Sequence, residues 1–119
     1  MSWNESEILK ARRAIFDTAQ GMLAGRLTYI EGARKIVAAW WTSKLDEWDA
    51  DFLPFVGIAS ETEALPFGEM RAHWQPAALD ALQPEINRME AWARRFGEPH
   101  CRDLVARFSS GQIKIEKLF

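Results

Sequence analysis

The chain has 119 residues, of which 48% are apolar and 27% charged, and its formal net charge is −2. This composition predicts a single folded domain and argues against disorder, and the mild acidity argues against nucleic-acid binding. One cysteine excludes an internal disulfide and fits a reducing compartment. Without a signal-peptide pattern, or an apolar run of roughly 18–20 residues that could span a membrane, we expect a cytoplasmic protein with no membrane contact.

The first two predicted helices form a hairpin. Asn4 is placed to cap a helix over residues 5–24, and Gly25 can end it in the left-handed conformation. Thr28 and Glu31 form a capping-box pattern for a second helix, and the short link favours an antiparallel pair. The predicted inner faces comprise Ile8, Ala11, Ile15, Ala19 and Met22 on the first helix, and Ile30, Ala33, Val37, Trp40 and Trp41 on the second.

The C-terminal half is predicted as three helices separated by prolines and a glycine. Pro76 can open a short helix that runs to Leu82. Pro84 then starts a second helix, Gly97 ends it, and Pro99 opens the last one. The predicted inner faces comprise Ile86, Met89, Ala93 and Phe96, followed by Cys101, Leu104, Val105 and Phe108.

Residues 109–119 break the helical pattern. The alternation Ile113-x-Ile115 leaves two alternatives, a short edge strand or a terminal arm that lies on the body. Residues 1–119 are therefore predicted to form one compact all-α domain. It is a helical bundle with an N-terminal hairpin, an irregular central segment and an optional C-terminal strand.

Four acidic residues, Asp46, Glu47, Asp49 and Asp51, follow the second predicted helix within six positions. A calcium-binding loop needs a glycine at its sixth position and a glutamate at its twelfth. Neither the register that starts at Asp46 nor the one that starts at Asp49 provides both residues. The segment is therefore predicted to be a solvated acidic loop rather than a metal site.

The residues that could carry nucleophilic or zinc chemistry are Cys101, His73 and His100. Cys101 lies on a predicted apolar face, and the adjacent His100 would point about 100° away from it around a helix. The three residues show no ligand spacing typical of zinc, and no glycine-rich phosphate loop is present. The sequence predicts no catalytic set, no metal and no cofactor.

The central stretch FVGIASETEALPFGEMRAHW, residues 55–74, does not read as one helix. Ser60 and Glu63 can start a one-turn helix, "LPFG" fits a type I turn, and residues 68–74 can form another short helix. We predict a compact irregular connection that packs over the hairpin. Such a connection leaves Glu61, Arg71 and Trp74 without a folding role, so they form either a structural Glu61–Arg71 clamp or a contact patch.

The same stretch carries the pattern F-V-G-I-x-S-E-T-x(2)-L-P-x-G-x(2)-R-x(2)-W. It resembles an uncharacterised family of small bacterial proteins, and the resemblance extends from Asp51 to Phe96. Glu63 stands where the family has an aspartate, which keeps the charge. The resemblance implies a bacterial, cytosolic, helical protein; it implies no activity, because none is known for the family.

Two functions of different classes fit these features. The first is a non-catalytic protein-binding module, most concretely an immunity or antitoxin-like protein that neutralises a bacterial toxin. Its contact residues would be Glu61, Arg71 and Trp74, and the acidic loop would steer a basic partner toward them. The predicted steering residues are Asp46, Glu47, Asp49 and Asp51.

The alternative is a small-molecule-binding or hydrolytic enzyme. Its pocket would be lined by Trp40, Trp41 and Trp74, with Glu61 as the base and Arg71 holding an anion. A third outcome is self-association, in which Trp48 or the Ile113–Ile115 edge is buried in a homodimer.

Overall fold

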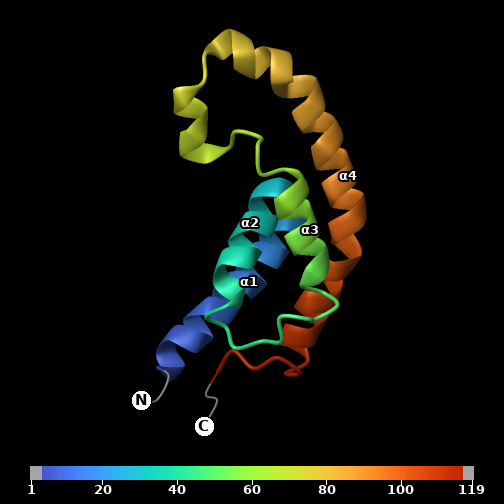
Figure 1. Cartoon of the computed structure of the whole chain (residues 1–119). Helices are drawn as coiled ribbons and strands as arrows, with labels where there is room; N and C mark the ends of the chain where they lie inside the picture. Colours follow the sequence, from blue (N-terminus) through green and yellow to red (C-terminus); the bar gives the residue numbers. More distant parts are fainter. Residues whose placement is uncertain (1–3, 117–119) are drawn as a thin grey trace.

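The computed structural model describes residues 4–116, and its secondary structure is helical. Four α-helices and one 3-10 helix follow in chain order: α1 (Glu5–Leu23), α2 (Tyr29–Trp40), α3 (Leu53–Glu61), η1 (Gly68–His73) and α4 (Pro76–Ser109). No strand occurs within residues 4–116, and the predicted all-α single-domain class is confirmed. Helices α1, α2 and α3 pack along the later turns of α4, and the start of α1 and the segment after α4 lie on the same side of the molecule (Figure 1).

Local capping interactions build the hairpin of α1 and α2, as predicted. The Asn4 side chain accepts a hydrogen bond from the Ser6 N–H at 2.9 Å, and Gly25 follows α1 with a φ of 78°. Thr28 Oγ1 accepts a hydrogen bond from the Glu31 N–H at 3.0 Å. These interactions satisfy backbone groups that a helix end leaves unpaired, which is why short sequence patterns locate them.

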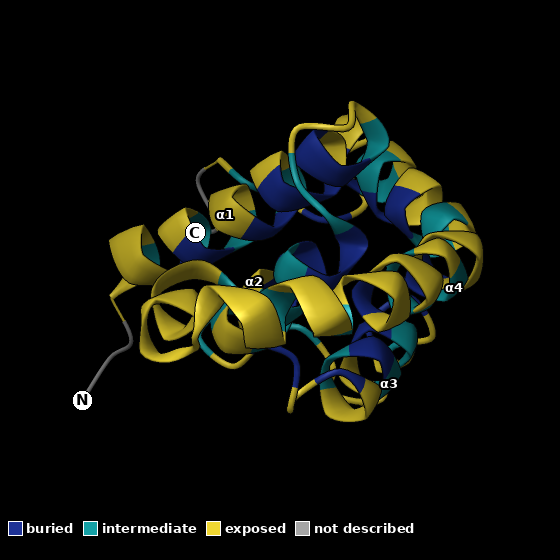
Figure 2. Ribbon diagram, turned by 90° about the horizontal axis from the view of Figure 1, so that it is seen from above, coloured by how far each residue is buried: buried dark blue, intermediate teal, exposed yellow. Residues whose placement is uncertain are grey.

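The core lies between the facing sides of the helices, where Figure 2 shows the buried turns. All five residues predicted for the inner face of α1 are buried. On α2, Trp40 is fully buried and stacks on Phe52, with ring centroids 4.4 Å apart and planes 6° from parallel. Trp41 was expected to face inward but is 59% exposed, because α2 ends at Trp40 and the chain turns away.

The three predicted C-terminal helices are one helix, α4, with Pro84 and Pro99 inside it. An internal proline removes one backbone hydrogen bond and pushes away the carbonyl four residues earlier, which bends a helix. The carbonyls concerned belong to residues 80 and 95, which are exposed, so water can satisfy them. Figure 1 shows α4 bowed around the body, so the prolines curve the helix rather than divide it.

Gly97 was predicted to end a helix, but it lies inside α4 and is buried. A Cβ atom placed on it would lie 3.1 Å from Ile58, 3.2 Å from Phe55 and 3.3 Å from Tyr29. The missing side chain therefore lets α4 approach α2 and α3 closely. The residue serves helix packing, and the prediction of a terminator is wrong.

Phe96 was predicted to be buried and is 44% exposed, because Gly97 takes the inward position beside it. Its ring stacks on Trp92, with centroids 5.6 Å apart. Leu53 and Val56 of α3 are 42% and 37% exposed. The outer sides of α3 and α4 thus carry several partly exposed apolar side chains.

After α4 the chain forms a terminal arm, the second of the two predicted alternatives. Gly111 turns the backbone with a φ of 82°, and Ile113 is buried in the core cluster. Arg12 of α1 donates from Nη1 to the carbonyl of Lys114 at 3.0 Å. Residues 117–119, the end of the predicted arm or strand, lie outside the described residues.

One end of the molecule projects from this body. The radius of gyration is 15.5 Å, against about 13.5 Å expected for a compact chain of this length. Residues 68–85, here called the projection, include η1 and the first turns of α4, and none of them is buried. They lie at the end of the molecule farthest from the start of α1 and the end of α4 (Figure 1).

Candidate functional site

The predicted Glu61–Arg71 clamp is not formed. Glu61 is the last residue of α3, Arg71 lies in η1, and both are exposed. Within residues 4–116 neither side chain makes an ion pair or a hydrogen bond. Ser60 does not start a helix as predicted, because α3 runs continuously through it.

Arg34 of α2 ties down the turn that the clamp was expected to hold. Its Nη2 donates to the carbonyl of Thr62 and, at 3.2 Å, to that of Leu65. Its guanidinium also lies 5.2 Å from the ring centroid of Phe67. Thr62 is fully buried and donates its hydroxyl proton to the Ile58 carbonyl at 2.7 Å. The turn is therefore fixed without Glu61 or Arg71, and both side chains remain in solvent.

The third predicted contact residue, Trp74, lies on the projection. It follows η1 and is 37% exposed, and Met70 within η1 is 50% exposed. Arg71 lies between them in sequence, and His73 is also exposed. The structure thus brings an arginine and two large apolar side chains to the surface on one short helical segment.

The Trp-lined pocket of the enzyme alternative does not exist. Trp40 is fully buried against Phe52, so it cannot line an accessible pocket. Trp41 is exposed beyond the end of α2, and Trp74 lies on the projection. Trp40 and Trp41 both contact Phe52, one from inside the core and the other from the surface, and Trp74 lies elsewhere, so the three rings do not line one pocket.

The acidic loop is solvated only at its beginning. Asp46 and Glu47 are exposed, and Asp46 Oδ1 accepts a hydrogen bond from the Trp48 N–H at 3.0 Å. The side chains of Asp49 and Asp51 are only 12% exposed, and both accept hydrogen bonds from Arg107 of α4. The expectation of a fully solvated loop is wrong for these two carboxylates.

Arg107 bridges the two aspartates. Its Nη1 donates to Asp49 Oδ1 and to Asp51 Oδ2, both at 2.9 Å, while its Nη2 donates to Asp49 Oδ2 at 2.8 Å. These hydrogen bonds raise the pKa of Arg107. Burial by itself would raise the pKa of Asp49, but the bonds from Arg107 and from the Asp51 N–H outweigh it, and the pKa is lowered. This cluster holds the loop against α4.

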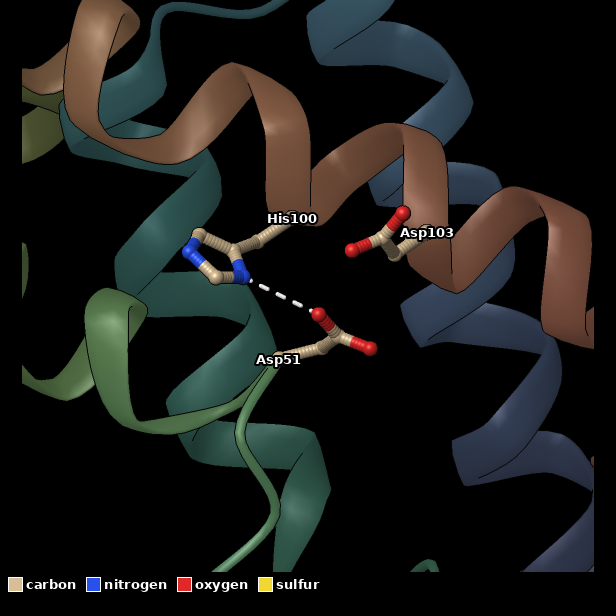
Figure 3. Close-up of side chains that lie close together, drawn as sticks. All are labelled: Asp51, His100 and Asp103. Atoms are coloured by element: carbon tan, nitrogen blue, oxygen red, sulfur yellow. Dashed lines mark hydrogen bonds and ion pairs between the residues drawn. The ribbon is translucent and has the colours of Figure 1, made fainter.

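The remaining oxygen of Asp51 faces a histidine. Asp51 Oδ1 lies 2.9 Å from His100 Nδ1, and Asp103 projects from the next turn of α4 toward the same space (Figure 3). One potential ligand atom from each of these three residues lies within 4.8 Å of the others. Neither a Cys/His spacing nor a calcium-loop pattern in the sequence points to this group, because Asp51 and His100 are 49 residues apart.

Among the described residues, Cys101 has no catalytic surroundings. It is fully buried on the inner face of α4, as predicted, and burial followed by the charge of Glu98 raises its pKa to about 12. Its Sγ lies 4.0 Å from Met22 Sδ, whereas the ring of the neighbouring His100 is directed to Asp51. A thiolate nucleophile is therefore not available here.

A hollow of about 440 Å³ beside the α1–α2 turn is lined in part by Glu90. Glu90 accepts hydrogen bonds from the N–H groups of Tyr29 at 2.7 Å and Ile30 at 3.1 Å. The backbone donors at the start of α2, which could otherwise bind an anion, are thus already satisfied.

No family model, curated protein or solved structure matches the chain. The resemblance to an uncharacterised bacterial family therefore stays a prediction. Within residues 4–116, no helix combines the length and the apolar character that crossing a bilayer requires.

Proposed function

We propose that the protein is a non-catalytic protein-binding module whose contact surface is the projection, residues 68–85. The observation that carries this proposal is a helical segment in which no residue is buried. Helices in proteins are stabilised mainly by packing an apolar face, and only Leu79 and Leu82 of the projection are half-buried, so most of this segment is suited to packing against another molecule. Trp74, Arg71 and Met70 are exposed there, and Trp and Arg often anchor protein interfaces.

The charge of this region favours a basic partner. The projection contains three acidic residues and one arginine, a net charge of −2; together with the seven residues before it, residues 61–85 carry a net charge of −4, in a chain whose net charge is −2. The remaining residues therefore carry +2. All five acids are exposed: Glu61, Glu63, Glu69, Asp80 and Glu85. An acidic surface attracts a basic one and repels its own copy, which disfavours a homodimer through this face.

The partner class that we propose is a basic bacterial toxin, which makes the protein immunity- or antitoxin-like. Toxins that act on nucleic acids need basic surfaces for the phosphate backbone, and an acidic projection could cover such a surface. Of the loop residues predicted to steer the partner, Asp46 and Glu47 are exposed, but their loop lies near the end of the molecule opposite the projection (Figure 1). Asp49 and Asp51 are engaged by Arg107 and contribute little to long-range steering.

The test begins with a photo-crosslinking residue placed at Met70 and, in a separate variant, at the exposed Arg13 of α1. We expect the Met70 variant, expressed in the native host, to capture a basic protein that the Arg13 variant does not. With that protein purified, Trp74→Ala should weaken binding tenfold or more, and binding should weaken as the salt concentration rises.

Trp48→Ala is the matched control, because Trp48 is 73% exposed and lies outside the projection. It should bind as tightly as the wild type. Equal binding by the Trp74→Ala variant, or capture of the same protein from Arg13 alone, would contradict the proposal. Toxin neutralisation is then tested by co-expression: the wild type should restore growth that the Trp74→Ala variant does not.

A further inference from the structure

We propose that Asp51, His100 and Asp103 form a binding site for a divalent transition-metal ion, for which Zn²⁺ is the natural probe. The three side chains converge from two distant parts of the chain (Figure 3). Asp51 precedes α3, while His100 and Asp103 are one turn apart on α4. Imidazole nitrogen and carboxylate oxygen are the donor types found in zinc sites with three protein ligands. This inference does not depend on the projection or on its partner.

The spacing of the donor atoms fits an ion after small movements. His100 Nδ1 and Asp51 Oδ1 are 2.9 Å apart, and the donor atom of Asp103 lies within 4.8 Å of both. In a tetrahedral zinc site with bonds of 2.0–2.2 Å, neighbouring ligand atoms are roughly 3.3–3.6 Å apart. The first pair must separate slightly, and the exposed side chain of Asp103 must close in by rotation.

The most buried ligand is already oriented. Arg107 donates to Asp51 Oδ2 at 2.9 Å and is itself positioned by donating two hydrogen bonds to Asp49, so Asp51 Oδ1 is directed at His100. Hydrogen bonds that fix a ligating carboxylate in this way typically accompany metal sites in proteins. The ion could bind at Oδ1 without breaking the Arg107 bridge.

The groups around the site carry a net negative charge, which favours the binding of a cation. The carboxylates of Asp49, Asp51 and Asp103 and the guanidinium of Arg107 sum to −2, with the imidazole of His100 counted as neutral. Asp103 makes no hydrogen bond or ion pair within residues 4–116, although another carboxylate lies close by. A divalent ion would balance the charge and give Asp103 a partner.

One side of the site is open to solvent. The side chains of Asp51 and His100 are 12% and 29% exposed, and Asp103 is exposed. An ion held by three protein ligands would keep at least one coordination position for water or a small ligand.

Zn²⁺ titrated into the full chain, purified without a polyhistidine tag, should bind at one ion per chain and raise the melting temperature. Asp103→Asn removes an exposed and unpartnered carboxylate, so the variant should fold normally and bind Zn²⁺ at least tenfold more weakly. His100→Gln keeps a hydrogen-bonding side chain near Asp51 and should also lose at least tenfold in affinity.

Asp80→Asn and His73→Gln are the matched controls, because both residues are exposed on the projection. Their affinities for Zn²⁺ should equal that of the wild type. The proposal is overturned if the wild type shows no saturable binding of one ion, or if Asp103→Asn binds as tightly as the wild type. It is equally overturned if His73→Gln loses as much affinity as His100→Gln.

Discussion

Two acidic segments of this chain look alike in sequence and differ in the folded molecule. In residues 46–51, the last two aspartates are largely buried and share the guanidinium of Arg107. In residues 61–85, all the acidic side chains are exposed. The neutralising arginine lies 58 residues from Asp49 and 56 from Asp51 along the chain. A run of acidic residues in the sequence therefore does not show whether its carboxylates are solvated or form structural ion pairs, because the basic partner can come from a distant helix.

Replacing Arg107 should produce the largest loss of stability, and it tests the difference between the two acidic segments most directly. Arg107→Ala leaves the carboxylates of Asp49 and Asp51 largely buried without their cation. Breaking one side of a buried ion pair typically costs about 3–5 kcal/mol, and we expect about 3 kcal/mol because these side chains keep some exposure. The measurement is the free energy of unfolding in urea at neutral pH.

Arg102→Ala is the matched control for this variant. Arg102 also lies on α4 and pairs with an acid, Glu98, but its side chain is 63% exposed. Exposed pairs contribute little, so this variant should lose less than about 1 kcal/mol. If Arg107→Ala were equally mild, the two acidic segments would not differ in the way the structure indicates.

The parts of the fold that the sequence predicted depend on contacts between near neighbours. Asn4, Thr28 and Gly25 mark helix ends because their capping partners lie within a few residues. The prediction failed at Pro99 and Gly97, where local preferences favour a break. There the packing of Gly97 against α2 and α3 outweighs the local preference, and α4 continues.

The residues of the candidate sites, too, were predictable only where their pattern lies within one segment of the chain. The exposed Arg71 and Trp74 were identified from a pattern within a single segment. The Asp51–His100–Asp103 group was not predicted because Asp51, in the loop, is 49 residues or more from the two members on α4. One local signal was present: His100 and Asp103 are three residues apart, which places both on one side of a helix.

Lowering the pH should also distinguish the two acidic segments, with a smaller change in stability than the one expected for Arg107→Ala. Since the pKa of Asp49 is lowered in the folded protein, its ionised form adds stability at pH values above its ordinary pKa of about 3.9. That stability is lost as the pH falls through the ordinary value and then through the folded value, because the unfolded chain takes up the proton first.

Asp49→Asn should therefore flatten the loss of stability between about pH 5 and pH 3. Melting temperatures recorded across this range for the variant and the wild type provide the measurement. Parallel curves for the two proteins would mean that the hydrogen bonds from Arg107 do not hold the carboxylate of Asp49 in its ionised form.

The smallest effects are expected at Glu61 and Arg71, for which the sequence predicted a clamp. Each alanine substitution should change the free energy of unfolding by less than about 0.5 kcal/mol, because both side chains are exposed and neither has a partner within residues 4–116. The change in the free energy of unfolding of the double variant should equal the sum of the changes in the single variants, since residues without mutual contact show additive effects. A shared loss well above this value, or clear non-additivity, would restore the clamp. If stability is unchanged while Arg71→Ala weakens binding of the captured partner, the arginine acts through contact alone, in contrast to Arg107.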